Sequence, residues 1–204
     1  MMKMISIVRE RLSILKAVIV GSYCIVKFRL LRRNVVIRFP FLAFAPVKIA
    51  GKGSVFIDKK CCIIYNYFRG IEIVTLSSNA KVIIGKDCTF GGLTIRCRRE
   101  IMIGENVMTG YGLIQDSFFI NEDMASSLEW LNRSKEYAPI RIGSKSWLGG
   151  QTTILEGTIL GDESVTGFGT LCLNEIVPDY HLALGSPVFR KMPIERIVQL
   201  VKRR

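Results

Sequence analysis

Apolar side chains recur every six residues through the second half of the chain. Five of six successive positions in this series carry a branched aliphatic side chain or a cysteine, and the sixth is a threonine: Ile142, Leu148, Ile154, Leu160, Thr166 and Cys172. Glycine occupies the next position in four cases, although only 18 of the 204 residues are glycine: Gly143, Gly149, Gly161 and Gly167. A fixed period of this kind indicates stacked structural units.

The six-residue period fits a triangular coil whose flat faces each send one aliphatic side chain into a narrow interior. The adjoining corner is tight and favours residues that tolerate unusual backbone angles, which explains the glycines. Three hexads close one coil, so the pattern predicts an all-β, parallel β-helix. Weaker hexads upstream extend it, with a one-residue slip between the second and third: Ile84-Gly85, Phe90-Gly91, Ile103-Gly104 and Thr109-Gly110.

The pattern places the coil over residues 47–177. Alternations such as Val47-Lys48-Ile49 read as strands at its start. Residues 1–46 mix apolar and basic side chains throughout, and we expect one or two short helices there that pack on the coil end or lie in a membrane interface.

The hexad phase is lost between Gln115 and Ile142, which predicts an extruded loop at about 117–139. The repeat also stops after Pro178, so residues 178–204 are expected to close the coil. A short basic helix completes this segment, because four apolar residues have helical spacing: Ile194, Ile197, Val198 and Val201.

Charge narrows the choice of partners. Lysine and arginine number 29 against 17 acidic residues, a formal charge of +12, which favours an anionic partner such as a phosphorylated ligand, a glycan or lipid headgroups. Nucleic acid is disfavoured, because no helix-turn-helix, zinc finger or aromatic stacking motif accompanies the basic residues. No apolar run reaches the length of a spanning helix. We expect a cytoplasmic protein, for which peripheral contact with the inner face of the membrane is one option.

Six cysteines form no C-x-x-C pair and have no histidine nearby, so the sequence predicts neither a metal site nor a redox motif. The simplest interpretation is that they are small buried side chains in a reducing compartment.

Longer motifs give the pattern a family. The segment from Pro139-Ile-Arg-Ile-Gly through Trp147-Leu-Gly-Gly to Gly167-Phe-Gly-Thr, followed by Gly185-Ser-Pro, resembles the signature of the hexapeptide-repeat acyltransferases. The likeness spans roughly residues 82–192 and is nearest to the sugar and polysaccharide O-acetyltransferases. The resemblance implies a left-handed β-helix, a homotrimer with active sites between subunits, acetyl-CoA as acyl donor and a sugar or glycan acceptor.

The family's catalytic histidine has no counterpart at its usual place. Family members carry a segment similar to Asp-Ser-Asp-x-His, whereas this chain has Asp116-Ser-Phe-Phe-Ile120, with isoleucine at the histidine position. The sole histidine, His181, lies in the closing segment, where a surface or packing role is the simpler interpretation. As a catalytic base it would need a trimer that brings it against the Asp116 of a neighbouring subunit. Asp116, Glu122 and Asp123 remain as candidate bases, because burial can raise a carboxyl pKa enough to accept a hydroxyl proton.

The acyl-donor side matches better. Trp147 stands where the family flanks its donor groove, and bare backbone at glycines allows the pantetheine arm of CoA to approach closely: Gly149, Gly150, Gly167 and Gly169. Arg190 and Lys191 follow the closing segment, and cations there suit the CoA phosphates. Packing explains Trp147 and the glycines equally simply, and solvation does the same for Arg190 and Lys191.

Two functions remain open. The first is acetyl-CoA-dependent O-acetylation of a sugar or polysaccharide precursor. The second is a catalytically impaired relative that serves as a scaffold or binding protein, because Phe118 and Ile120 would make the catalytic pocket apolar.

Overall fold

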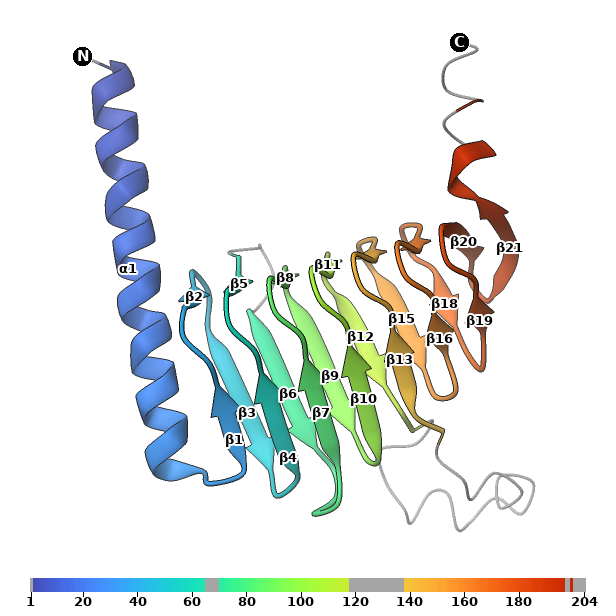
Figure 1. Cartoon of the computed structure of the whole chain (residues 1–204), viewed down its shortest axis with the longest axis horizontal. Helices are drawn as coiled ribbons and strands as arrows, with labels where there is room; N and C mark the ends of the chain where they lie inside the picture. The colour runs from blue at the N-terminus through green and yellow to red at the C-terminus, as the bar shows by residue number, and fades with distance from the viewer. Residues whose placement is uncertain (1, 65–69, 118–137, 197–198, 200–204) are drawn as a thin grey trace.

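A computed structural model describes residues 2–64, 70–117, 138–196 and 199, and confirms the predicted parallel β-helix (Figure 1). One α-helix, α1 (Met2–Leu31), precedes 21 short strands in this described part of the chain. Each strand of a coil pairs in parallel with the strand three places later, so the coils stack into three sheets. The described strands make six complete coils and part of a seventh.

The three sheets are named A, B and C in the order in which a coil visits them. Sheet A holds β1 (Val35–Ile37), β4 (Ser54–Ile57), β7 (Lys81–Ile84), β10 (Glu100–Ile103), β13 (Ile140–Ile142), β16 (Ile159–Leu160) and β19 (Ile176–Val177). Sheet B holds β2 (Phe41–Ala43), β5 (Cys61–Ile63), β8 (Thr89–Phe90), β11 (Met108–Thr109), β14 (Trp147–Leu148), β17 (Val165–Thr166), β20 (His181–Gly185) and the antiparallel β21 (Val188–Pro193). Sheet C holds β3 (Val47–Gly51), β6 (Ile71–Thr75), β9 (Leu93–Cys97), β12 (Gly112–Gln115), β15 (Thr152–Leu155) and β18 (Leu171–Cys172).

The aliphatic hexad positions form columns inside the coil, as predicted. One column on sheet A joins paired residues from first coil to last: Ile37, Ile57, Ile84, Ile103, Ile142, Leu160 and Val177. All seven are at least 93% buried. Thr166, the polar member of the series, is buried too, and its hydroxyl lies 3.1 Å from that of Thr152. The slip also appears, because paired residues Ile84 and Ile103 are 19 apart in sequence against 18 for Ile142 and Leu160.

The glycines after the hexad positions serve close packing, which corrects the expectation that they supply unusual backbone angles. None of Gly143, Gly149, Gly161 and Gly167 has a positive φ. A Cβ on Gly143 would lie 2.4 Å from the carbonyl carbon of Gly161 in the next coil. The positive φ angles at this corner fall two residues later, at Lys145 (57°) and Glu163 (54°).

The N-terminal segment differs from the expectation of short helices. A single helix of 30 residues covers most of it, and strands β1 and β2 already belong to the first coil, which therefore begins at Val35 and not at residue 47. Gly21 lies inside α1 and does not break the helix. The helix packs so closely on the coil at this position that a Cβ would lie 1.8 Å from the carbonyl oxygen of Phe41. Bare backbone at this position lets the helix dock on the coil end.

Two predicted features lie mostly outside the described residues. These are the extruded loop at about 117–139 and the basic helix over 194–202, of which only the first turn, residues 194–196, and residue 199 are described as helical. At the C-terminal end, the described residues close with β21 pairing antiparallel to β20.

All six cysteines are free thiols, and five are buried. Cys61 and Cys88 stack in an interior corner, where each Sγ lies 3.2 Å from a glycine carbonyl of the next coil, Gly85 and Gly104 respectively. Ser146 makes the equivalent bond to Gly161 at 3.0 Å. The thiols of Cys61 and Cys88 are thus small corner donors. Among the described residues no group of three potential metal ligands occurs.

Candidate functional site

Asp116 follows β12 at the corner between sheets C and A, and its side chain is fully buried. Its carboxylate accepts hydrogen bonds from the backbone amides of Arg98 (2.6 Å), Arg99 (2.7 Å) and Glu100 (2.8 Å), at the preceding corner between sheets C and A. The thiol of Cys97 lies 3.5 Å from the same carboxylate. Burial and this carboxylate raise the pKa of Cys97. These contacts are those of a carboxylate that holds a turn in place.

His181 begins β20 in the last coil, at the corner between sheets A and B, and is partly buried. Its Nδ1 lies 2.7 Å from the backbone carbonyl of Asp179. Asp116 belongs to the fourth coil and to a different corner, and three strand spacings of about 4.8 Å separate those coils. A single chain therefore does not bring His181 and Asp116 together.

Trp147 lies on the outer face of sheet B and is 54% exposed. It stands in an outward column in which each residue pairs with its neighbour on the next strand: Met108, Trp147, Val165 and Leu182. The column leads along the coil axis toward the C-terminal end. It gives one edge of the candidate site an apolar wall.

The four predicted glycines gather beside this wall, at the corner between sheets B and C. We call the described residues Gly110–Tyr111, 149–151 and 167–169 of three successive coils the glycine corner. A Cβ on Gly149 would lie 2.7 Å from the carbonyl oxygen of Thr166, and one on Gly150 would lie 3.1 Å from the ring of Phe168. Gly169 differs, because its φ is +68° and a Cβ there would meet nothing within 4 Å.

Two aromatic residues of the glycine corner were not singled out from the sequence. The rings of Tyr111 and Phe168 meet edge to face with centroids 6.5 Å apart, and Phe168 is 70% exposed. Each directly follows a corner glycine, Gly110 and Gly167, so their place in the repeat was the available signal. Together they present an exposed apolar surface beside bare backbone.

Arg190 extends the same corner. It lies on β21 and pairs with Leu184 of β20, whose side chain would meet a Cβ on Gly167 at 2.4 Å. Arg190 is exposed. Lys191 is engaged elsewhere, because its ammonium lies 2.5 Å from a carboxylate oxygen of Glu175 and donates to the carbonyl of Ile176 at 2.8 Å. The structure thus brings Trp147, the glycines and Arg190 together, and leaves Asp116 and His181 apart.

Segments of this chain are similar in sequence to known proteins. A Staphylococcus aureus (strain Mu50) protein named "Putative acetyltransferase SAV2555" is 39% identical over 70 residues, which are 32% of this chain and 35% of that protein. A Mycobacterium tuberculosis protein named "Probable acetyltransferase Rv3034c" is 30% identical over 108 residues, 52% of this chain and 33% of that protein. The aligned segments thus span about a third of these relatives. The chain matches no protein-family model.

Solved structures share the fold at low identity. The polySia-specific acetyltransferase NeuO superposes with a TM-score of 0.53 at 20% identity, covering 78% of this chain and 70% of that one. An N-acyltransferase from Bacillus cereus, solved with coenzyme A and dTDP-4-amino-4,6-dideoxyglucose, gives 0.54 at 16% identity, covering 84% and 90%. The chain thus shares its parallel β-helix fold with these two proteins.

Proposed function

We propose that this protein is an acyl-CoA-dependent acetyltransferase that acetylates a hydroxyl of a sugar or cell-surface polysaccharide precursor. The names of the sequence relatives support acetyl transfer, and the Bacillus cereus neighbour is solved with coenzyme A. A polysialic-acid acetyltransferase among the neighbours supports a glycan acceptor. The choice of a hydroxyl over an amine rests on the signature motifs, because the neighbours include both an acetyltransferase specific for polysialic acid and an N-acyltransferase.

The observation that carries the proposal is the glycine corner and its continuation to Arg190. A pantetheine arm is a chain of amides and methylenes, which binds best where backbone groups are open to hydrogen bonding and an apolar surface lies alongside. The corner supplies glycine backbone with Phe168 and Tyr111 beside it. The CoA phosphates need a cation at one end of this strip, and Arg190 stands there with its guanidinium exposed.

The reaction also needs an acceptor side. The acceptor oxygen attacks the thioester carbonyl while a base takes its proton, and CoA leaves as the thiol after protonation. His181 and the glycine corner lie at different corners of one chain, so a neighbouring chain would have to bring this base against the donor strip. We therefore propose a homotrimer with its sites between subunits. His181 is a remaining candidate base, and so are Glu122 and Asp123, which lie outside the described residues, since the carboxylate of Asp116 is occupied by backbone amides.

The test is calorimetric titration of the purified protein with acetyl-CoA, with desulfo-CoA as a non-acylating ligand. We expect micromolar binding of both, and an Arg190→Gln variant should bind about tenfold or more weakly, since hydrogen bonds to charged groups contribute about 1.5 to 3 kcal/mol. Arg33→Gln is the matched control, because Arg33 is exposed just beyond α1 at the opposite end of the coil. Absence of binding by the folded wild type refutes an acyl-CoA enzyme.

The alternative function is that of a catalytically impaired homologue that binds a partner or serves as a scaffold. The burial of Asp116 in backbone hydrogen bonds favours it, together with isoleucine at position 120 in the sequence. Such a protein would bind CoA without transferring acetyl groups, or would not bind CoA at all. An assay of acetyl transfer to a polysaccharide acceptor, monitored through the free thiol of the CoA that is released, decides between the two functions.

A further inference from the structure

Helix α1 has two apolar stripes, of which only one packs on the coil. Its coil-facing stripe consists of Ala17, Gly21, Cys24 and Phe28, which are all buried. The second stripe is open to solvent and has spacings of three and four: Leu12, Leu15, Ile19, Tyr23, Val26 and Leu30. These six side chains are 55% to 77% exposed, which is unusual for so many large apolar residues in one row.

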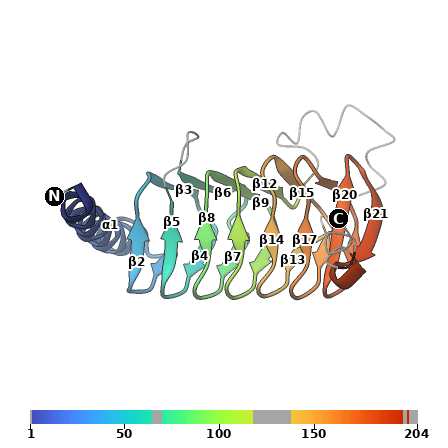
Figure 2. The same ribbon diagram turned by 90° about the horizontal axis from the view of Figure 1, so that it is seen from above.

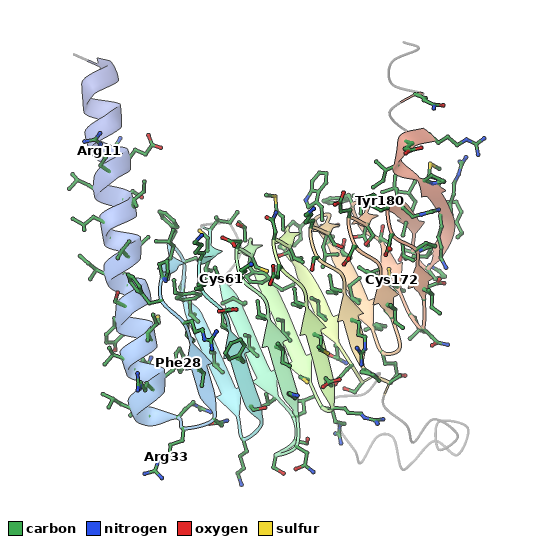
Figure 3. The ribbon with its side chains drawn as sticks, in the orientation of Figure 1. Arg11, Phe28, Arg33, Cys61, Cys172 and Tyr180 are labelled. Atoms are coloured by element: carbon green, nitrogen blue, oxygen red, sulfur yellow. The ribbon has the colours of Figure 1, made fainter. Side chains whose placement is uncertain are left out.

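The two stripes lie on opposite sides of the helix. At 3.6 residues per turn, Val26 lies about half a turn around the axis from Ala17, and the other five residues of the second stripe fall within about 60° of Val26. Figure 3 shows Phe28 on the side of α1 that faces the strands, and Arg11 on the part of the helix that extends beyond them. The exposed stripe thus faces away from the coil, and no described part of the chain covers it.

Basic residues flank the exposed stripe on both sides. By the same helical geometry, Arg9, Lys16 and Lys27 fall along one edge and Arg11 and Arg29 along the other, and all five are exposed. Lys27 lies against this edge in the structure, with its ammonium 6.0 Å from the ring centroid of Tyr23. Glu10, the only acidic residue of α1, falls on the coil-facing side.

We propose that α1 docks on an anionic lipid bilayer, with the exposed stripe in the interface and the flanking cations against lipid phosphates. An apolar row bordered by lysine and arginine is the composition of helices that lie in the membrane interface. A second copy of the chain fits this surface poorly, because its helix would set arginine and lysine against arginine and lysine. Within the described residues, no helix has an apolar stretch sufficient to cross a bilayer.

The proposal fixes an orientation. Because α1 stands against the first coil and exposes the side that faces away from the strands (Figures 1 and 2), its docking on the membrane directs the coil stack away from the bilayer. The glycine corner and Arg190 belong to the fourth to seventh coils. The donor strip then lies several coils above the lipid surface, where an acceptor borne on a lipid-linked chain would have to reach it.

The experiment is co-sedimentation of the full chain with two kinds of vesicle, phosphatidylcholine alone and phosphatidylcholine with 30% phosphatidylglycerol. We expect binding to the anionic vesicles that falls with salt, and little binding to the neutral ones. A Leu15→Gln, Ile19→Gln, Val26→Gln variant tests the apolar stripe, and an Arg11→Gln, Lys16→Gln, Arg29→Gln variant tests the edges. Removing a charge should lower the partition coefficient roughly fivefold, so the basic variant loses on the order of 100-fold.

The control variant removes three exposed lysines from the coil, Lys48→Gln, Lys52→Gln and Lys59→Gln, and should bind vesicles as the wild type does. Circular dichroism and the acetyl-CoA titration on each variant separate loss of docking from loss of folding or donor binding. Three outcomes overturn the proposal: no binding by the wild type at low salt, an apolar variant that binds unchanged, or a control that loses as much as the basic variant. A stripe variant that changes only the oligomeric state assigns the stripe to a second copy instead.

Discussion

At the scale of single residues, the corners of the coil set the strictest demands. The sequence pattern assigned two requirements to the same glycines, close approach of successive coils and unusual backbone angles, but the structure places these requirements at different residues. Close approach of successive coils needs glycine at positions such as Gly143 and Gly161, where any Cβ would meet backbone or the Asp179 carboxylate. The left-handed backbone angle falls at Lys145 and Glu163, whose side chains leave the corner and meet each other at 2.9 Å.

This separation predicts unequal costs for two glycine substitutions. Gly143→Ala places a Cβ 2.4 Å from the backbone of Gly161, which cannot move without shifting a coil, so we expect a loss of about 2 to 3 kcal/mol of unfolding free energy. Gly169→Ala meets nothing within 4 Å and pays only for its positive φ, about 1 kcal/mol. Urea denaturation of the two variants measures the difference, and equal losses would show that the close approach of the next coil is not what requires glycine at position 143.

Asp116 provides a second test at this scale. Replacing it with asparagine puts an amide, itself a donor, where three backbone amides of Arg98, Arg99 and Glu100 point at a carboxylate. We expect a loss of about 3 kcal/mol of unfolding free energy, because hydrogen bonds to a charged acceptor are strong and the amides are left poorly paired. The readout is the urea midpoint, compared with transfer activity. A variant of unchanged stability that has lost activity would instead identify Asp116 as the base.

At the scale of elements, α1 shows what periodicity can and cannot predict. The coil strands each have one buried face, so a single period describes them, and the sequence placed most of them correctly. The helix has an apolar stripe on each of two opposite sides, so its apolar residues do not follow a single helical period. The sequence therefore showed only a segment of mixed apolar and basic residues. Its length and the start of the first coil at Val35 therefore could not be predicted from amphipathicity.

At the scale of the whole molecule, stacking explains why the fold was predictable and the site was not. A coil repeats the same local requirement along its axis, so Ile142, Leu160 and their equivalents reveal it in one dimension. A site depends on which corners of successive coils coincide. The glycines and Arg190 proved to share one corner, whereas Asp116 and His181 lie at two others, and only the assembled structure gives that arrangement.

Buried thiols give the whole molecule a predictable response to alkaline pH. Burial raises the pKa of Cys24 in α1 and of Cys62 and Cys97 in the coil, and it raises the pKa of Cys172 near the far end from 9.0 to about 12. The folded protein therefore keeps these protons when the unfolded chain begins to release them. The stability they contribute is complete below pH 9 and declines as pH rises from about 9 toward 12, by about 1.4 kcal/mol per pH unit for each fully shifted thiol.

Urea midpoints measured at pH 7, 8.5 and 10 test this expectation, with Cys172→Val as the matched variant. Cys172 is fully buried, and Figure 3 shows it in the coil far from α1. Valine keeps an apolar side chain of similar size at this interior position and has no ionisable group. All other ionisable residues are common to the two proteins, so the thiol accounts for the difference between the two curves. The variant's midpoint should fall less steeply between pH 8.5 and 10. Parallel curves would mean that the unfolded chain does not release this proton before the folded one, and that the thiol has no part in alkaline unfolding.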